Sequence, residues 1–188
     1  MKPEEQMVPT HAIRLLVEGR PGTGKTTVAR RLVELLRAHG VPLTGFTSAE
    51  IREGGRRMGF AIETVDGERA TLAHVGFPGP PRVGRYGVDL KGFERVAVPS
   101  LRDPGPDGLV VIDELGKMEL ASSVFRERVS TLLEVGASIV ATVHVFRHPF
   151  TDALKRRPGV ELVRISEANR DRLAEALLQR ILNRRLTA

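Results

Sequence analysis

The sequence predicts a three-layer α/β domain with a mainly parallel β-sheet, and three observations support this class. Short apolar segments at residues 12–18, 109–113 and 138–143 are typical of strands that are buried on both faces. Segments with an apolar stripe at helical spacing alternate with these strands along the chain. Strands that alternate with helices in this way join one sheet that is covered by helices.

The first predicted strand and helix lie on either side of a glycine-rich segment. Residues 12–18 read AIRLLVE and end at Gly19. Residues 26–39 predict a helix whose apolar stripe consists of Val28, Leu32, Leu35 and Leu36. Gly40 is of the type that commonly ends a helix. We therefore expect a buried strand, a tight loop and a helix that ends near Gly40.

An antiparallel section follows the first helix. Residues 41–53, 57–65 and 68–75 have the composition of strands. The dipeptides Gly54-Gly55 and Asp66-Gly67 between them are hairpin signals. We therefore expect antiparallel strands inserted into the sheet after the first helix.

The second half alternates again between helices and strands. Residues 76–87 (GFPGPPRVGRYG) predict a loop that is too long for a simple connection and is therefore of functional interest. The further predicted strands are residues 109–113, 138–143 and 160–165. The further predicted helices are residues 93–102, 125–135 and 169–184, with one more between the last two strands.

The composition fits one domain over residues 12–188, preceded by a polar lead-in at residues 1–11. The chain has no cysteine, which excludes disulfides, thiolate metal sites and cysteine nucleophiles and favours the cytoplasm. No apolar run reaches the roughly 18 residues of a membrane helix. The net charge of +6 leaves a nucleic-acid partner open, although aromatic residues make up only 4%. We expect a monomer.

The strongest functional signal is the segment GRPGTGKT, which matches G-x-x-x-x-G-K-[ST] between a predicted strand and helix. Glycines let successive backbone amides point at phosphates, and the helix N-terminus favours an anion. Lys25 supplies a cation for the β- and γ-phosphates, and Thr26 supplies a hydroxyl for Mg²⁺. The predicted nucleotide-binding residues of this loop are Gly19, Arg20, Pro21, Gly22, Thr23, Gly24, Lys25 and Thr26.

A second signal is the acidic pair at the end of the apolar run VVIDE. Asp113 has the position of an acid that holds Mg²⁺ through water, and Glu114 can orient and deprotonate the attacking water. Glu114 and Lys25 are thus the predicted catalytic residues, and Thr26 and Asp113 the predicted metal residues. The segment up to Gly116 also fits D-x-x-G of small GTPases, but no N-K-x-D or T-K-x-D follows. We therefore expect loose base selectivity.

Four residues near these motifs have roles that the sequence leaves open. Arg82 and Arg85 suit phosphate contact or a solvated loop, and Tyr86, the only tyrosine, suits stacking on a base or simple packing. Lys117 either faces phosphate or begins the next helix.

Polar residues follow the predicted strand at 138–143. Thr142 is a candidate for contact with the γ-phosphate or the attacking water. His144 and His148 have no metal-ligand spacing with other residues, so we expect loop positions and no zinc site.

Five sequence segments, taken in this order along the chain, match those of a known protein family: GRPGTGKTT, GFTSAEIREGGRRMGF, RVGRYGVDL, VVIDELGKMEL and SEANRDRL. The sequence resembles the small P-loop nucleoside-triphosphatase family that includes cancer-related nucleoside-triphosphatase. The resemblance implies a RecA-like P-loop fold with an additional strand. It also implies slow hydrolysis of ATP, GTP and other nucleoside triphosphates, with Glu114 as the catalytic glutamate. The further residues that it implies to line the nucleotide are Leu109, Val110, Val111, Ile112, Asp113, Glu114, Leu115 and Gly116.

Two other functions remain open from the sequence. A nucleotide or small-molecule kinase would use the arginine-rich loop as a lid over a second substrate. A nucleotide-dependent nucleic-acid-binding module would account for the positive charge.

Overall fold

A mixed β-sheet of nine strands forms the centre of the part of the chain that the computed structural model describes, residues 12–186. The strand order is β5-β6-β4-β3-β2-β7-β8-β1-β9. The parallel strands are β1 (Arg14–Gly19), β2 (Leu43–Glu53), β7 (Leu109–Leu115), β8 (Ile139–His144) and β9 (Glu161–Arg164). The antiparallel strands are β3 (Arg56–Thr64), β4 (Arg69–His74), β5 (Arg82–Val83) and β6 (Tyr86–Val88).

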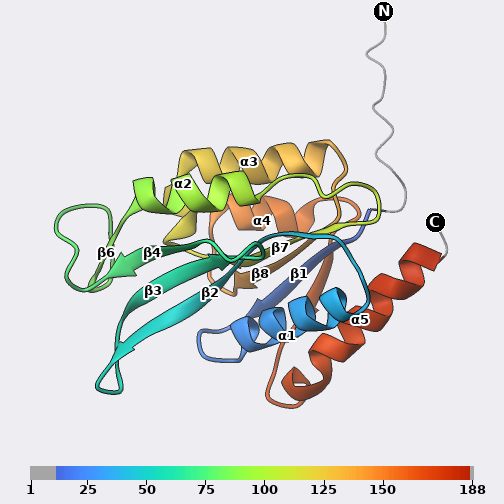
Figure 1. The fold of residues 1–188 in the computed structure, drawn as a ribbon, viewed down its shortest axis with the longest axis horizontal. Helices are drawn as coiled ribbons and strands as arrows, with labels where there is room; N and C mark the ends of the chain where they lie inside the picture. The colour runs from blue at the N-terminus through green and yellow to red at the C-terminus, as the bar shows by residue number, and fades with distance from the viewer. Residues whose placement is uncertain (1–11, 187–188) are drawn as a thin grey trace, which may run out of the picture.

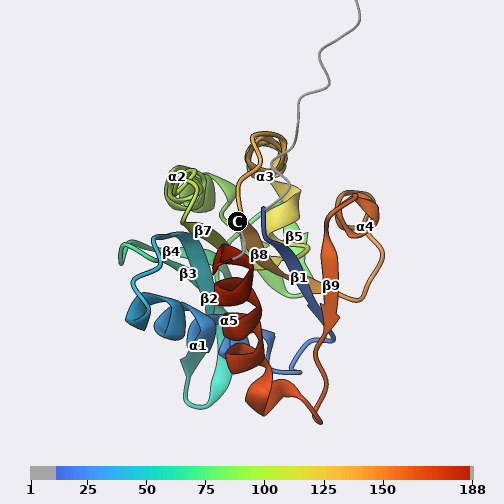
Figure 2. The ribbon, with the colours of Figure 1, turned by 90° about the vertical axis from the view of Figure 1, so that its right-hand side faces the viewer.

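Helices cover both faces of this sheet, as Figures 1 and 2 show. One face carries α1 (Lys25–Ala38) and α5 (Arg170–Leu186), which pack against each other. The other face carries α2 (Leu90–Ser100), α3 (Ser123–Glu134) and α4 (Pro149–Arg156). A short 3₁₀ turn, η1 (Glu119–Ala121), precedes α3. The predicted three-layer α/β class with a mainly parallel sheet is therefore confirmed.

Each face of the sheet has its own apolar core. Beneath α2 and α3, Phe46 of β2 packs edge-on against Phe93 and at a tilt against Phe125, with ring centroids 5.9 Å and 6.0 Å away. All three rings are fully buried. On the opposite face, the predicted stripe of α1 packs with apolar residues of α5. Burial of apolar surface on both faces explains why the parallel strands are almost continuously apolar.

The turn signals are confirmed, and the boundaries differ by a few residues. The α1 helix ends just before Gly40, whose N–H donates to the carbonyl of Arg37 at 2.9 Å. The α2 helix begins three residues earlier than predicted because Asp89 caps it, accepting from the N–H of Gly92 at 2.9 Å.

The prediction of a loop at residues 76–87 was wrong in part. The segment contains β5 and most of β6, which pair as a hairpin. The Arg82 guanidinium donates to the carbonyls of Phe77 and Arg85, at 3.2 Å and 2.6 Å, and so closes this hairpin. Strands of two and three residues carry no alternation that a sequence pattern can reveal.

The predicted lead-in at residues 1–11 lies outside the described residues, so the proposed start of the domain at residue 12 stays a prediction. No helix among residues 12–186 is long and apolar enough to cross a membrane.

Candidate functional site

The site lies at the edge of the sheet where the carboxyl ends of β1, β7 and β8 meet. The strand β8 lies between β1 and β7. Gly19, the last residue of β1, is level with His144, the last residue of β8. The glycine-rich loop continues from Gly19 into α1. The loop, the acidic end of β7 and the polar end of β8 are therefore brought together by strand order.

Two glycines are needed for the shape of the loop. Gly24, at the N-terminus of α1, has φ +99°, a left-handed conformation that other residues rarely adopt. A Cβ atom on Gly19 would collide with the side chain of Ile165 and lie 2.6 Å from Thr23 Oγ1. Thr23 in turn donates its N–H and its hydroxyl to the carbonyl of Arg20, at 3.3 Å and 2.8 Å. The loop is thus a compact turn that feeds directly into a helix N-terminus.

Lys25 lies inside this turn and is only 5% exposed. Its Nζ donates to the carbonyls of Gly19 and Arg20, at 3.1 Å and 3.2 Å. The same Nζ is 3.4 Å from Glu114 Oε2. The structure therefore brings the two predicted catalytic residues into contact, at the helix end where an anion is favoured.

A chain of hydrogen bonds joins the two predicted metal residues. Asp113 is fully buried, and its Oδ2 accepts from the N–H of Ser48 at 3.1 Å and from its hydroxyl at 2.7 Å. Its Oδ1 accepts from the hydroxyl of Thr142 at 2.6 Å. The Ser48 hydroxyl also lies 3.3 Å from Thr26 Oγ1. Ser48, which the sequence did not single out, therefore links Thr26 to Asp113.

The donor set of this chain suits Mg²⁺. Hydroxyl and carboxylate oxygens are the protein ligands that Mg²⁺ accepts, usually together with water and substrate phosphates. Within the described part of the chain, no cluster of three or more histidine or acidic side chains could hold a metal by itself. The residues fit an ion that takes its other ligands from a phosphate and from water.

Two glutamates with raised pKa values lie beside the Lys25 contact. Burial raises the pKa of Glu114, while the charge of Lys25 acts against the rise. Burial, and then the charge of Glu114, raise the pKa of Glu119 to about 8. A Cβ atom on Gly116 would lie 3.0 Å from Glu114 Oε1 and 2.7 Å from Glu119 Oε2, so the two carboxyls flank this glycine. At neutral pH the buried Glu119 carboxyl is mostly protonated.

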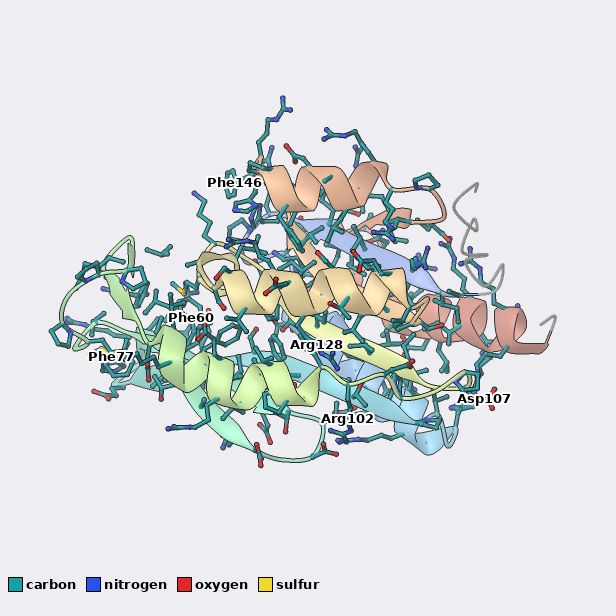
Figure 3. All side chains as sticks on the ribbon, turned by 90° about the horizontal axis from the view of Figure 1, so that it is seen from above. Phe60, Phe77, Arg102, Asp107, Arg128 and Phe146 are labelled. Carbon is teal, nitrogen blue, oxygen red and sulfur yellow. The ribbon has the colours of Figure 1, made fainter. Side chains whose placement is uncertain are left out.

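These groups open onto one cavity of about 570 Å³. Of the predicted site residues, the cavity is lined by Pro21, Gly22, Gly24, Lys25, Thr26, Glu114 and Gly116. Its remaining wall is formed by Thr27 of α1, by residues of β2, β3 and β5, by His144 at the end of β8, and by residues of the segments after β7 and β8. Phe60 and Phe146 of this wall lie toward one end of the domain in Figure 3, opposite Asp107, which precedes β7.

The apolar residues of β7 do not line this cavity: Leu109, Val110, Val111, Ile112 and Leu115. Their contact with a bound nucleotide, which the family resemblance implies, stays a prediction. The side chains of residues 109–112 alternate between the two apolar cores, and Leu115 lies in the core beneath α2 and α3. Each of the five is at most 1% exposed. Asp113 also lies behind the cavity wall, so its predicted link to a metal would pass through water.

The polar end of β8 differs from expectation. Thr142 does not reach the cavity, because its hydroxyl is used by Asp113. His144 is not a loop residue but the buried end of β8, and it lines the cavity. His148 caps α4 by accepting from the N–H of Phe150 at 3.2 Å.

The arginines and the tyrosine of the 76–87 segment organise the hairpin. Tyr86 packs edge-on against Phe60 at 5.2 Å, and the Arg85 guanidinium lies over the Tyr86 ring at 5.2 Å. Arg85 also donates to the backbone carbonyl of Arg57. None of the 76–87 residues except Val83 lines the cavity. Lys117 does line it, with Nζ 5.4 Å from the Phe146 ring centroid.

The site combines a glycine-rich loop around a buried lysine with an acidic pair at the end of β7, and β8 separates β7 from the strand that leads into the loop. This combination defines a P-loop protein that binds nucleoside triphosphates. The family model described as NTPase matches residues 14–178, and the chain belongs to this family.

Similar proteins agree with this assignment. Nucleoside-triphosphatase THEP1 of Thermotoga petrophila is 42% identical over 167 residues, covering 88% of this chain and 91% of that protein. Human cancer-related nucleoside-triphosphatase is 40% identical over 176 residues, covering 86% and 93%. The crystal structure of THEP1 from Aquifex aeolicus superposes with a TM-score of 0.80 at 31% identity, over 90% of this chain and 99% of that chain. The solution structure of the human protein gives 0.79 at 38% identity, over 90% and 97%.

Proposed function

We propose that this protein hydrolyses nucleoside triphosphates, ATP and GTP among them, to the diphosphate and phosphate in a Mg²⁺-dependent reaction. One observation carries the proposal: Glu114 and Lys25 meet at 3.4 Å on the wall of the cavity. Lys25 has the position of the lysine that binds the β- and γ-phosphates of a nucleotide. A water molecule held by Glu114 would therefore lie beside the terminal phosphate.

Glu114 is the general base of this mechanism. Burial raises its pKa, which makes its carboxylate a stronger base, and the charge of Lys25 opposes this rise. The carboxylate orients a water molecule in line with the β–γ bond and accepts its proton. The loop amides and Lys25 stabilise the negative charge that develops on the phosphate oxygens.

Thr26 would hold Mg²⁺ through its hydroxyl, with Ser48 and Asp113 behind it. Bound Mg²⁺ would neutralise charge on the β- and γ-phosphates. Asp113 is already fixed by three hydrogen bonds, from Ser48 and Thr142. This network keeps the carboxylate in one orientation and so positions its water-mediated contacts.

Broad base specificity is the second part of the proposal. The sequence lacks the N-K-x-D or T-K-x-D motif with which GTPases recognise guanine. Because nothing in the P-loop or the acidic pair reads a base, hydrolysis should depend on the triphosphate far more than on the nucleoside.

The absence of cysteine from the chain favours a cytoplasmic protein.

The test is phosphate release from ATP, GTP, CTP and UTP, with and without Mg²⁺, and with no acceptor molecule present. We expect release from all four, only with Mg²⁺. Glu114→Gln should bind nucleotide normally but turn over roughly 100-fold or more slowly, since it lacks the base. Glu127→Gln, on the exposed surface of α3, is the matched control.

Full turnover by Glu114→Gln would contradict the proposed role. Phosphate transfer that requires an added acceptor would favour a kinase, and strong stimulation by RNA or DNA would favour a nucleic-acid-dependent enzyme.

A further inference from the structure

Arg57 brings a further cation to the cavity from a different part of the sheet than Lys25. It lies near the start of β3, and its side chain lines the same cavity as Lys25 and Glu114. The side chain is 41% exposed, so its guanidinium is accessible to a ligand in the cavity. The mechanism proposed above gives this arginine no task.

The geometry of β2 places the Arg57 guanidinium near the predicted metal residues. Ser48 and Glu50 are two residues apart on β2, so their side chains lie on the same face of the strand. The Ser48 hydroxyl lies beside Thr26 and Asp113, whereas Glu50 pairs with Arg57. The rise of a strand separates Ser48 from Glu50 by only about 7 Å. Arg57 is therefore held one ion pair away from the place where the metal and the terminal phosphate would bind.

The contacts that hold the Arg57 side chain in this position are incomplete. Its Nη2 pairs with Glu50, and its guanidinium carbon lies 5.4 Å from the centroid of the Phe60 ring. Its Nε is buried and has no hydrogen-bond partner among the described residues. A partly exposed ion pair contributes little, because water screens the two charges. A triphosphate, which carries several negative charges, would compete well with the single charge of Glu50 for this guanidinium.

The backbone around Arg57 is fixed, so only the side chain has to move. Arg85 donates to the carbonyl of Arg57. Across the β2–β3 turn, Arg52 donates to the carbonyl of Gly55 at 2.9 Å and to the carboxylate of Glu50 at 2.8 Å. The guanidinium of Arg57 can therefore turn toward the phosphate site by a change of rotamer, without a movement of the hairpin.

The phosphoryl group that is transferred needs a cation on the side that the phosphate loop does not cover. During hydrolysis, negative charge spreads over three equatorial oxygens of this group. Lys25, the loop amides and a metal at Thr26 all approach from the side of α1. The planar guanidinium of an arginine suits the oxygens that face the opposite side. Among the described residues, Arg57 is the only arginine that lines the cavity.

We propose that Arg57 leaves Glu50 when a nucleoside triphosphate binds, and that its guanidinium then donates to the terminal phosphate in the transition state. The inference rests on the proposed function, because it assumes that the β–γ bond is broken in this cavity. Arg57 stays protonated throughout, and the proton of the attacking water goes to Glu114. Glu50 is then a resting partner that holds the guanidinium back and so slows turnover.

The test measures kcat for phosphate release and the affinity for ADP and Mg²⁺ with and without aluminium fluoride, which mimics the phosphoryl group in transfer. We expect Arg57→Ala to lower kcat roughly 100-fold or more. The variant should bind ADP within about twofold of wild type but lose the gain in affinity that aluminium fluoride gives. Arg57→Lys keeps the charge without the planar fork and should recover only part of kcat.

Two variants of the same ion-pair cluster complete the test. Arg52→Ala is the matched control, because Arg52 also pairs with Glu50 but does not line the cavity. It should keep the wild-type kcat. Glu50→Gln should turn over at least as fast as wild type, because it no longer holds the guanidinium of Arg57.

A wild-type kcat in Arg57→Ala, or an equal loss in Arg52→Ala, would overturn the proposal. A Glu50→Gln variant as slow as Arg57→Ala would also overturn it, because the site would then need the ion pair and not the released guanidinium. Should Arg57→Ala not fold, Arg57→Gln gives the same comparison. A wild-type protein that releases no phosphate would contradict the proposed hydrolysis itself, whereas full hydrolysis by Arg57→Ala would contradict only the role of Arg57.

Discussion

Replacing Thr142 with valine tests whether Asp113 is held as a buried carboxylate by its hydroxyl partners. The substitution keeps the shape of the side chain and removes a hydrogen bond of 2.6 Å to Asp113 Oδ1. Asp113 is fully buried, so water cannot replace the lost donor. A hydrogen bond to a charged group contributes about 1.5–3 kcal/mol. For a domain of this size, that loss lowers Tm by about 3–12 °C.

Thr44→Val is the matched control. The Thr44 hydroxyl is similarly buried but donates to a neutral acceptor, the carbonyl of Arg102, at 2.8 Å. Its loss should cost only about 0.5–1.5 kcal/mol. Thermal and urea unfolding followed by circular dichroism give both values. If Thr142→Val destabilised the protein no more than Thr44→Val, the claim that Thr142 supports a buried charge would be refuted.

Three further predictions concern the same site. Ser48→Ala removes the hydroxyl between Thr26 and Asp113. We expect the Mg²⁺ concentration that gives half-maximal phosphate release to rise about 10-fold. An unchanged Mg²⁺ requirement would contradict the link. Lys25→Ala should lower kcat/KM roughly 100- to 1000-fold and weaken nucleotide binding, whereas the exposed Lys91→Ala should change neither. The raised pKa of Glu119, about 8 against an ordinary 4.5, means that the folded state binds this proton more tightly than the unfolded state. Its stabilising effect is therefore complete below about pH 4.5 and is lost as the pH rises toward 8, by up to about 1.4 kcal/mol per pH unit. Glu119→Gln, which stays neutral, should show a smaller fall in Tm between pH 5 and 8 than wild type, and parallel curves would disprove the shift.

Much of the fold could be predicted because its signals are local. The loop from Gly19 to Thr26 is recognisable from the spacing of its glycines, lysine and threonine and from its place between an apolar strand and a helix with an apolar stripe. The acidic pair at Asp113 and Glu114 is evident because it ends a continuous apolar run. These patterns record what a short segment must bury and which backbone conformations it can adopt.

Contacts between distant residues could not be predicted in the same way. Ser48 lies 65 positions before Asp113, and nothing in either segment indicates that they meet. Glu119 follows the acidic pair closely in the sequence, but only the η1 turn shows that its side chain lies in the interior. His144 reads as the start of a loop, although β8 continues through it and buries its ring.

The sequence by itself determined the α/β class, the phosphate loop, the acidic pair and the family resemblance. Only the tertiary structure decided which side chains share the cavity and which, such as Ile112, belong to the core. Parallel strands that are buried on both faces have similar apolar patterns, so their composition does not reveal their order in the sheet. The position of β8 between β1 and β7 is what places His144 beside Gly19 and Thr142 beside Asp113.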